Sequence, residues 1–535
     1  MRPDSALRFV AGLALAVLLT ACDSPEPKPA PTEIVIGNSA DPGTLDPHRA
    51  EGVPARNIQR DLFEGLVARN RAGDLVPGVA AEWQYDADTL TWTFSLRDDA
   101  RWSNGDPLTA DDFVRSFQRA LSPNTAGVVS ETLLPIRNAA AVIAGDVPPA
   151  ELGVSAADAL TLKIQLEGPT PYFLALLDHP STVPVHASTD ESAELVSNGA
   201  YRLLEWRVND YVLLERNPHY RDAASVAIDR VRFLPISDMS VELNRFRAGE
   251  LDITYGIPPG RMAWLAEQYP DALRVNPWFG VYYLGLNVDD ESLNDPGVRR
   301  ALAMAIDRET LVESITPGGE TVAFSWVPAF DGYPLVVPGW AAGTLQQRQD
   351  EARQILARAG YDENNKLSLD ILYNNRDRDQ RIMSAVAAMW EESLPVEAQL
   401  DAREWKVYLG IKQRKLATQV FRSGWIGEYQ DPFTFAEVFG STHGMNEFNW
   451  ASERYDALLA QARETEDTAA RFRLLAEAER IVLDELPAIP LFHYAKARLV
   501  SPRVEGYSTH PLDHHYTRHL SFRREAGEHE DRRPD

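Results

Sequence analysis

The chain has 535 residues, of which 44% are hydrophobic, and its formal net charge at pH 7 is −26. A single hydrophobic core stops growing at about 250–300 residues, so this length predicts more than one core. The negative charge disfavours nucleic acids and anionic membrane surfaces as partners, and it favours cationic or zwitterionic small molecules. The chain has one cysteine, Cys22, which excludes thiol catalysis and thiolate metal sites in the folded body.

The first 22 residues have the layout of a secretory signal peptide. Arg2 and Arg8 are positively charged, and the apolar run at residues 9–19 is too short to span a membrane. Small residues then precede Cys22, whose thiol can be linked to diacylglycerol. The alternative is an ordinary signal peptide with a chance cysteine. By resemblance to Gram-negative lipoproteins, Asp23 implies retention at the inner membrane.

Two terminal segments have the composition of unstructured chain. Residues 23–31 are rich in proline, and the last eight of them predict an extended tether about 25 Å long at ~3.1 Å per residue. The body begins near Glu33 with an apolar run. Residues 526–535 are charged and poor in apolar side chains, which predicts a disordered tail.

Strands and helices are mixed along the body. Alternation of apolar and polar residues predicts strands at residues 90–96, 160–166 and 367–373. Helices are predicted after Thr109, after Pro296 and after Asp467. Thr109 and Asp112 form a capping box, and Pro123 ends that helix. Asp467 caps a long helix that ends at Pro487. The mixture predicts an α/β protein with more than one domain.

Motifs for catalysis are missing from the sequence. It contains no P-loop, G-x-G-x-x-G, G-x-S-x-G or H-E-x-x-H pattern. Four histidines lie near the C-terminus, at His510, His514, His515 and His519. On a helix, His515 and His519 would share a face and could bind a metal, but we expect solvated surface histidines. Adjacent carboxylates at 111–112, 289–290 and 391–392 are most simply solvated. These features do not indicate an enzyme.

Six segments carry a more specific pattern, in this order: DPGTLDPHRAEGVPARNIQRDLFEGL (41–66), WTFSLRDDARWSNGDPLTADDFVRSFQRAL (92–121), SNGAYRLLEWRVNDYVLLERNPHY (197–220), NRFRAGELDITYG (244–256), RSGWIGEYQDPFTF (422–435) and KARLVSPRVEGY (496–507). Together they resemble the extracellular solute-binding proteins of family 5, which deliver peptides to ABC importers. The resemblance runs from about residue 34 to residue 522, and the chain looks like the oligopeptide-binding members.

The resemblance implies an α/β type II periplasmic-binding-protein fold. In that fold two lobes are joined by hinge strands, and a third domain is inserted beside the first lobe. Mapped onto this chain, the parts are lobe I at 32–63, 187–280 and 491–525, the inserted domain at 64–186, and lobe II at 281–490.

A carrier of arbitrary peptides must bind what all peptides share, which is the backbone and the two charged ends. The resemblance implies that two strand segments pair with the ligand backbone, namely Glu51, Gly52 and Val53, and Gly424, Trp425 and Ile426. It places Glu428 where the oligopeptide binders hold the ligand ammonium with an aspartate. The alternatives are a loop carboxylate that faces solvent, or Asp431 as the ammonium partner, although Asp-Pro more often starts a turn.

Further positions match ligand-contacting residues of the family. Trp405 and Trp425 match tryptophans that line side-chain pockets, with a core aromatic as the alternative for each. The other matches are Tyr494, Asn374 and Asn244 as contacts, and Arg422 and Lys412 near the carboxylate end. Asp379 replaces a histidine that helps at that end, and an anion there would repel a carboxylate unless a cation or water intervened. Residues 124–129 lack the aromatic of the family, which puts one side-chain pocket in doubt.

The sequence therefore predicts a monomeric peptide-binding lipoprotein in the periplasm. Its expected partners are short peptides and the permease and ATPase subunits of an importer, with no cofactor, metal or nucleic acid, and with membrane contact through the lipid anchor alone. A second hypothesis keeps the fold and changes the cargo to a dipeptide, murein peptide, glutathione, haem or a nickel chelate. A third is a hydrolase, or a holdase for unfolded chains.

Overall fold

The computed structural model describes residues 32–50, 52–123, 125, 132–190, 195–414 and 419–523. The predicted signal peptide with Cys22, the tether, Glu51, the segment 124–129 except residue 125, and the charged tail lie outside these residues. No helix in the described ranges is long and apolar enough to cross a lipid bilayer.

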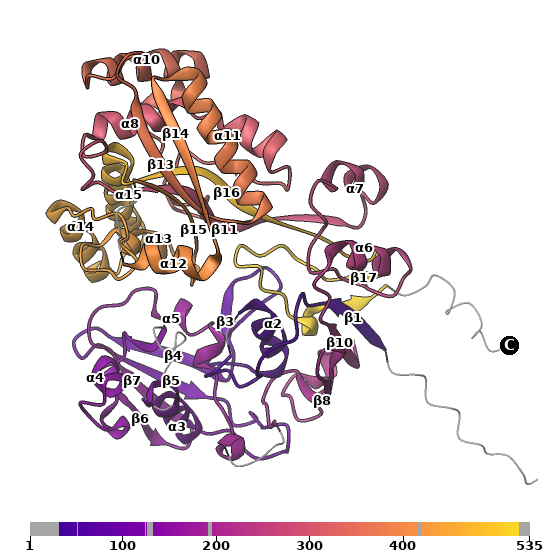
Figure 1. The fold of residues 1–535 in the computed structure, drawn as a ribbon. Helices are drawn as coiled ribbons and strands as arrows, with labels where there is room; N and C mark the ends of the chain where they lie inside the picture. The colour runs from indigo at the N-terminus through magenta and orange to yellow at the C-terminus, as the bar shows by residue number, and fades with distance from the viewer. Residues whose placement is uncertain are drawn as a thin grey trace, which may run out of the picture. The chain divides into compact units, whose positions relative to one another are not determined.

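A four-stranded sheet opens the body (Figure 1). Its strands, in spatial order, are β1 (Glu33–Gly37), β10 (Arg230–Leu234), β9 (Tyr211–Arg216) and β8 (Tyr201–Arg207). β1 is parallel to β10, and the other neighbours are antiparallel. Ile58 and Leu62 of helix α2 (Val53–Leu62) are fully buried in one core with Ile34 and Tyr201 of this sheet. Two further helices follow the sheet, α6 (Met239–Arg247) and α7 (Met262–Gln268).

A second four-stranded sheet is antiparallel throughout. Its spatial order is β4 (Ala80–Asp86), β5 (Thr91–Leu96), β7 (Thr161–Gln165) and β6 (Val154–Asp158). Helix α3 (Ala110–Leu121) packs on β6 and β7, and its capping box of Thr109 and Asp112 is confirmed. The remaining elements here are β2 (Val67–Arg69), β3 (Leu75–Pro77), α4 (Ala139–Ala144) and α5 (Phe173–Leu176). Both predicted strands are present. β5 begins one residue later than predicted, since Leu90 has a φ of 52°, and β7 is one residue shorter at each end.

The largest sheet in the described residues is mixed and has six strands. Its spatial order is β12 (Thr321–Val322), β16 (Ala488–Leu499), β11 (Leu273–Leu286), β15 (Val420–Ile426), β13 (Leu367–Asn374) and β14 (Val396–Arg403). The two long strands β11 and β16 are antiparallel, and β13 is parallel to both β14 and β15. A short pair, β17 (Val504–Glu505) with β18 (Ser521–Phe522), closes the described chain.

Helices cover both faces of this sheet. Successive residues of a strand point to opposite sides, so β11 contributes side chains to the core on each face. On β11, Tyr282 and Leu284 share a core with α8 (Pro296–Ala305), α10 (Leu345–Arg358) and α11 (Asp377–Ser393), which Figure 1 shows beside β13 and β14. Val281 and Tyr283 join the core of the opposite face. That face carries α12 (Trp405–Gln413), α13 (Phe433–Ala436), α14 (Glu453–Glu464) and α15 (Thr468–Glu485).

The helix boundaries follow the predicted signals. Asp467 caps α15 by accepting a hydrogen bond from the main-chain N–H of Ala470 at 2.7 Å. That helix ends at Glu485, and Leu486 takes a φ of 49° directly before Pro487. Helix α8 begins at Pro296, as expected for a proline in the first turn.

Candidate ligand-binding site

Strand β15 is paired along its whole length on one side only. β11 pairs with it from Ile426 back to Val420. On the other side β13 pairs with Val420 and Phe421, and within the described part of the chain its pairing ends there. The stretch from Arg422 to Ile426 therefore has an open edge on the β13 side.

Three residues of this stretch direct main-chain groups to the open edge. The N–H of Gly427 donates to the carbonyl of Phe279 on the β11 side, at 2.8 Å. Hydrogen-bonded pairs alternate along antiparallel strands, so Trp425 also faces β11. Gly424 and Ile426 then present their N–H and C=O groups to the open edge. The carbonyl of Arg422 lies on the same edge and accepts a hydrogen bond from the Tyr408 hydroxyl. An extended ligand can pair with such an edge through its backbone alone.

Gly424 is required at its position by the ring of Tyr494. A Cβ atom on Gly424 would lie 2.3 Å from the Tyr494 hydroxyl oxygen. The ring cannot easily move away, because its centroid is 5.6 Å from that of Trp278 and 5.8 Å from that of Phe492. The predicted residues Gly424 and Tyr494 are thus in close contact.

We expect Gly424→Ala to lower the free energy of unfolding by about 1–3 kcal/mol, because the methyl group overpacks the contact with Tyr494. Gly410→Ala is the matched control. Gly410 lies inside α12, and the nearest atom to its added Cβ is 3.5 Å away on Arg414. Alanine there should stabilise the helix by about 0.5–1 kcal/mol. Urea unfolding of both variants checks this, and equal effects would contradict the proposed contact.

The two predicted tryptophans differ in exposure. Trp405 is the first residue of α12 and is 40% exposed, so the alternative of a core aromatic is wrong for it. Its ring stacks on Tyr408, with centroids 5.6 Å apart, and the Arg376 guanidinium lies 5.3 Å from its centroid. Trp425 is half-buried, and its indole N–H donates to the carbonyl of Thr434 at 2.8 Å.

A buried ion pair lies at the Arg422 end of the open edge. Arg422 Nε is 3.0 Å from Asp379 Oδ1. Asp379 also accepts hydrogen bonds from the Tyr282 hydroxyl and from the Asn374 side-chain amide, each at 2.9 Å. The structure thus brings Asn374 and Arg422 together around Asp379. Arg422 is therefore the cation that lies beside the Asp379 carboxylate, which would otherwise repel a ligand carboxylate.

Lys412 has a comparable arrangement. Its Nζ is 2.8 Å from a Glu447 carboxylate oxygen and donates to the Ser423 hydroxyl at 2.8 Å. The side chains of Lys412 and Glu447 are only 8% and 4% exposed. Burial lowers the pKa of Lys412, and the opposing effect of the Glu447 charge is smaller.

The other end of β15 is acidic. Glu428 is exposed, and its main-chain N–H donates to the Thr434 hydroxyl at 3.2 Å. Asp431 is buried, forms an ion pair with Arg471, and accepts the main-chain N–H of Phe433 at 2.8 Å. These contacts compensate its charge and confirm the turn interpretation, which disfavours Asp431 as an ammonium partner.

Three predicted residues lie in other elements. Gly52 and Val53 are not in a strand, which corrects the prediction for this segment. Gly52 has a φ of 82° and precedes α2, whose first residue is Val53 and whose second is Pro54. A proline in the first turn favours a helix start, and glycine tolerates this φ. Asn244 is exposed on α6. Glu51 lies outside the described residues.

The prediction of solvated C-terminal histidines was wrong. His510 is 4% exposed, His514 Nδ1 is 3.3 Å from a carboxylate oxygen of Asp178, and His515 Nε2 is 2.9 Å from Asp513. Burial lowers the pKa of His510 to about 3. Asp178, the partner of His514, is far away in sequence, so no local signal marks that contact. Within the described ranges, no group of three or more side chains suits a metal ion.

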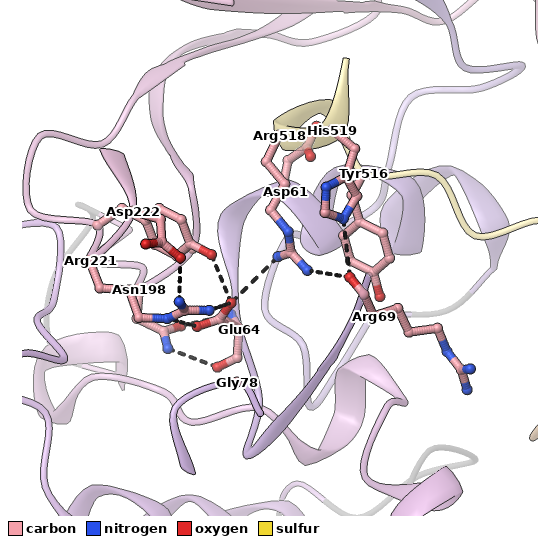
Figure 2. Close-up of polar contacts among 12 residues, drawn as sticks. Asp61, Glu64, Arg69, Gly78, Asn198, Arg221, Asp222, Tyr516, Arg518 and His519 are labelled. Atoms are coloured by element: carbon pink, nitrogen blue, oxygen red, sulfur yellow. Dashed lines mark hydrogen bonds and ion pairs between the residues drawn. The ribbon is translucent and has the colours of Figure 1, made fainter. Parts of the chain in front are cut away.

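A buried polar network joins this C-terminal segment to the end of α2 (Figure 2). Arg518 donates to the carbonyl of Arg69 at 3.2 Å and lies 3.6 Å from a Glu64 carboxylate oxygen. The Arg69 side chain in turn forms an ion pair with Asp178 at 2.7 Å and donates to the Gln430 side chain at 2.5 Å. Sequence reasoning missed Gln430, which follows the acidic end of β15.

Known proteins with similar sequences cover nearly the whole chain. The periplasmic oligopeptide-binding protein OppA of Salmonella typhimurium is 38% identical over 96% of this chain and 97% of its own length. The periplasmic murein peptide-binding protein MppA of Escherichia coli is 37% identical, over 91% of this chain and 92% of its own length.

Solved structures agree. The unliganded open form of MppA, a periplasmic murein tripeptide-binding protein, has a TM-score of 0.84 at 36% identity and covers 92% of this chain and 97% of its own. Haemophilus influenzae OppA in complex with RPPGFSPFR has a TM-score of 0.75 at 34% identity, with 92% and 99% covered. The α/β type II periplasmic-binding-protein fold is therefore confirmed. The profile "Bacterial extracellular solute-binding proteins, family 5 Middle" matches residues 74–447, so the chain belongs to the family 5 extracellular solute-binding proteins.

Proposed function

We propose that this protein captures short peptides in the periplasm and delivers them to an ABC importer. The observation that carries the proposal is the open edge of β15, where Gly424 and Ile426 present main-chain groups to a ligand. Backbone pairing of this kind gives affinity whatever the ligand side chains are. Relatives named as oligopeptide-binding proteins, which match over nearly their full length, support this cargo.

Glu428 receives the ligand ammonium in this proposal. It stands two residues past Ile426, at the acidic end of the edge, and it is exposed. Trp405 and Trp425 contact ligand side chains. The remaining residues that we propose for the site are Glu51, Gly52, Val53, Asn244, Asn374, Tyr494, Arg422 and Lys412, of which Arg422 and Lys412 are paired with Asp379 and Glu447.

Calorimetry with tri- to pentapeptides tests the proposal. We expect saturable binding, and we expect Glu428→Gln to weaken it about tenfold, since hydrogen bonds to charged groups contribute about 1.5–3 kcal/mol. N-acetylation of the peptide should weaken it by a similar factor. Glu464→Gln, an exposed glutamate at the end of α14, is the control and should have no effect.

Two outcomes would contradict these roles separately. Equal affinity for free and N-acetylated peptides would remove Glu428 from its role and leave the backbone pairing intact. No binding of any peptide would refute the proposed cargo. Native mass spectrometry of the purified protein then identifies what co-purifies. The fold also serves relatives named for murein peptide, dipeptide and probable deoxycholate binding, so these are the first alternative cargoes.

The proposal extends to location and domain organisation. Residues 1–22 would direct export, lipidated Cys22 would anchor the protein to the inner membrane, and residues 23–31 would act as a tether. Lobe I (32–63, 187–280 and 491–525), the inserted domain (64–186) and lobe II (281–490) would bind the peptide as a monomer, without catalysis, and present it to the permease and ATPase subunits.

A further inference from the structure

The cations beside the open edge of β15 already have buried anionic partners. Arg422 lies in the strand itself, and Lys412 contacts the neighbouring residue Ser423. Each of the two cations is within 3.0 Å of a carboxylate, from Asp379 and Glu447 respectively. The Arg422 end of the edge is therefore close to electrically neutral, in contrast to the acidic Glu428 end.

The Arg422–Asp379 ion pair is buried, and Arg422 Nε makes no hydrogen bond at this contact. The side chains are 15% and 3% exposed, so solvent screens their attraction weakly. Both oxygens of Asp379 are occupied, since Oδ1 accepts from Tyr282 and Oδ2 from Asn374. A ligand carboxylate that approached Arg422 would meet the Asp379 charge. Displacing Asp379 would leave a buried carboxylate without its cation, which is strongly unfavourable.

Lys412 is no better placed to receive a ligand anion. Its Nζ donates to Ser423 and pairs with Glu447, whose side chain is 4% exposed. On the neighbouring helix α11, Arg378 forms an ion pair with Glu320 at 2.7 Å, and Arg376, the residue before this helix, lies over the ring of Trp405. Arg376 is exposed, so a ligand anion could reach it.

We propose that Asp379 and Glu447 are specificity-determining residues that make the Arg422 end of the site indifferent to a ligand carboxylate. The protein would then accept peptides whose carboxyl end is blocked or uncharged, such as peptide amides, at least as tightly as the free acids. This inference rests on the proposed function. An uncompensated arginine would instead favour the free acid by about tenfold or more through a charge-assisted hydrogen bond.

The test compares alanine tri-, tetra- and pentapeptides, each with a free amino end, as the free acid and as the amide. Calorimetry on the wild-type protein should give dissociation constants for the amides equal to or lower than those for the acids. Asp379→Asn keeps the shape and removes the charge, so it should shift the acid-to-amide preference toward the acid by about tenfold. Asp252→Asn is the control, because Asp252 is a buried partner of Arg503 in another part of the chain, and the ratio should not change.

The outcomes separate the inference from the proposed function. A wild-type preference of tenfold or more for the free acids would overturn the inference while supporting peptide binding. This comparison uses only the wild-type protein, so it tests the inference even if Asp379→Asn does not fold. If the wild-type protein prefers the free acids and Arg376→Gln abolishes that preference, Arg376 binds the ligand carboxylate and the inference is also wrong. If none of the peptides binds in either form, the proposed function fails and the inference falls with it.

Discussion

Replacing Glu479 with glutamine is expected to stabilise the protein at pH 8 and to have no such effect near pH 4. Glu479 lies on α15 and is 4% exposed. One carboxylate oxygen accepts the main-chain N–H groups of Trp326 and Val327, at 2.8 and 2.9 Å, and the other accepts the Tyr333 hydroxyl at 2.9 Å. No cation is among these three donors. Burial therefore raises the pKa of Glu479 from 4.5 to about 7.

The direction of the pH effect follows from this raised pKa. Below the ordinary value of 4.5 the carboxyl is protonated in both the folded and the unfolded chain, so folding carries no penalty. As the pH rises toward 7, the unfolded chain loses the proton first and stability falls. Above pH 7 the penalty is complete, at about 3 kcal/mol for a shift of this size. Glutamine retains an oxygen for the two N–H groups and carries no charge, so it avoids the penalty.

Urea unfolding at pH 8, 6 and 4 measures this effect. Glu477→Gln is the matched control, since Glu477 lies on the same helix, is 44% exposed and pairs with Arg454 at the surface. A surface pair of this kind contributes little to stability. A Glu479→Gln variant that is destabilised equally at all three pH values would show that Tyr333 needs the carboxylate as an acceptor and that the penalty is absent.

The parts of the fold that could be predicted are those set by local sequence. The capping box of Thr109 and Asp112, the cap at Asp467 and the alternating strand at 367–373 depend on residues a few positions apart, and all three are present. The C-terminal histidines were misjudged because their environment is not local. His514 meets Asp178, which lies more than 300 residues earlier in the chain, and only the folded structure brings the two together.

The candidate site shows the same division. The strand at Gly424–Ile426 was predicted, but its open edge arises because β13 stops pairing at Phe421, and no residue pattern marks that point. In the sequence, Asp379 is an anion at the end of the site where the ligand carboxylate is expected. Its compensation by Arg422 depends on the contact between α11 and β15. At Gly52 a family strand was expected, and the local Gly-Val-Pro sequence starts a helix instead.

Glu64→Ala is expected to destabilise the protein more than any substitution considered above. Glu64 is 4% exposed and lies two residues after the end of α2 (Figure 2). One of its oxygens accepts from the Tyr220 hydroxyl at 2.8 Å, and Arg221 donates to both oxygens at 3.0 and 3.1 Å. Arg518 is a second cation, 3.6 Å away. Although burial alone lowers the pKa of Arg221, the Glu64 charge raises it above its ordinary value.

Alanine would leave Arg518, whose side chain is 9% exposed, without this carboxylate, while Arg221, 15% exposed, would keep only its ion pair with Asp222. Breaking a buried pair by removing one partner costs about 3–5 kcal/mol, and thermal and urea unfolding should show a loss of that size. Combining Glu64→Ala with Arg518→Met should recover part of it, because one uncompensated charge is then removed as well. If the double variant is less stable than Glu64→Ala, Arg518 is held by the Arg69 carbonyl and not by Glu64, and the network in Figure 2 does not act through charge.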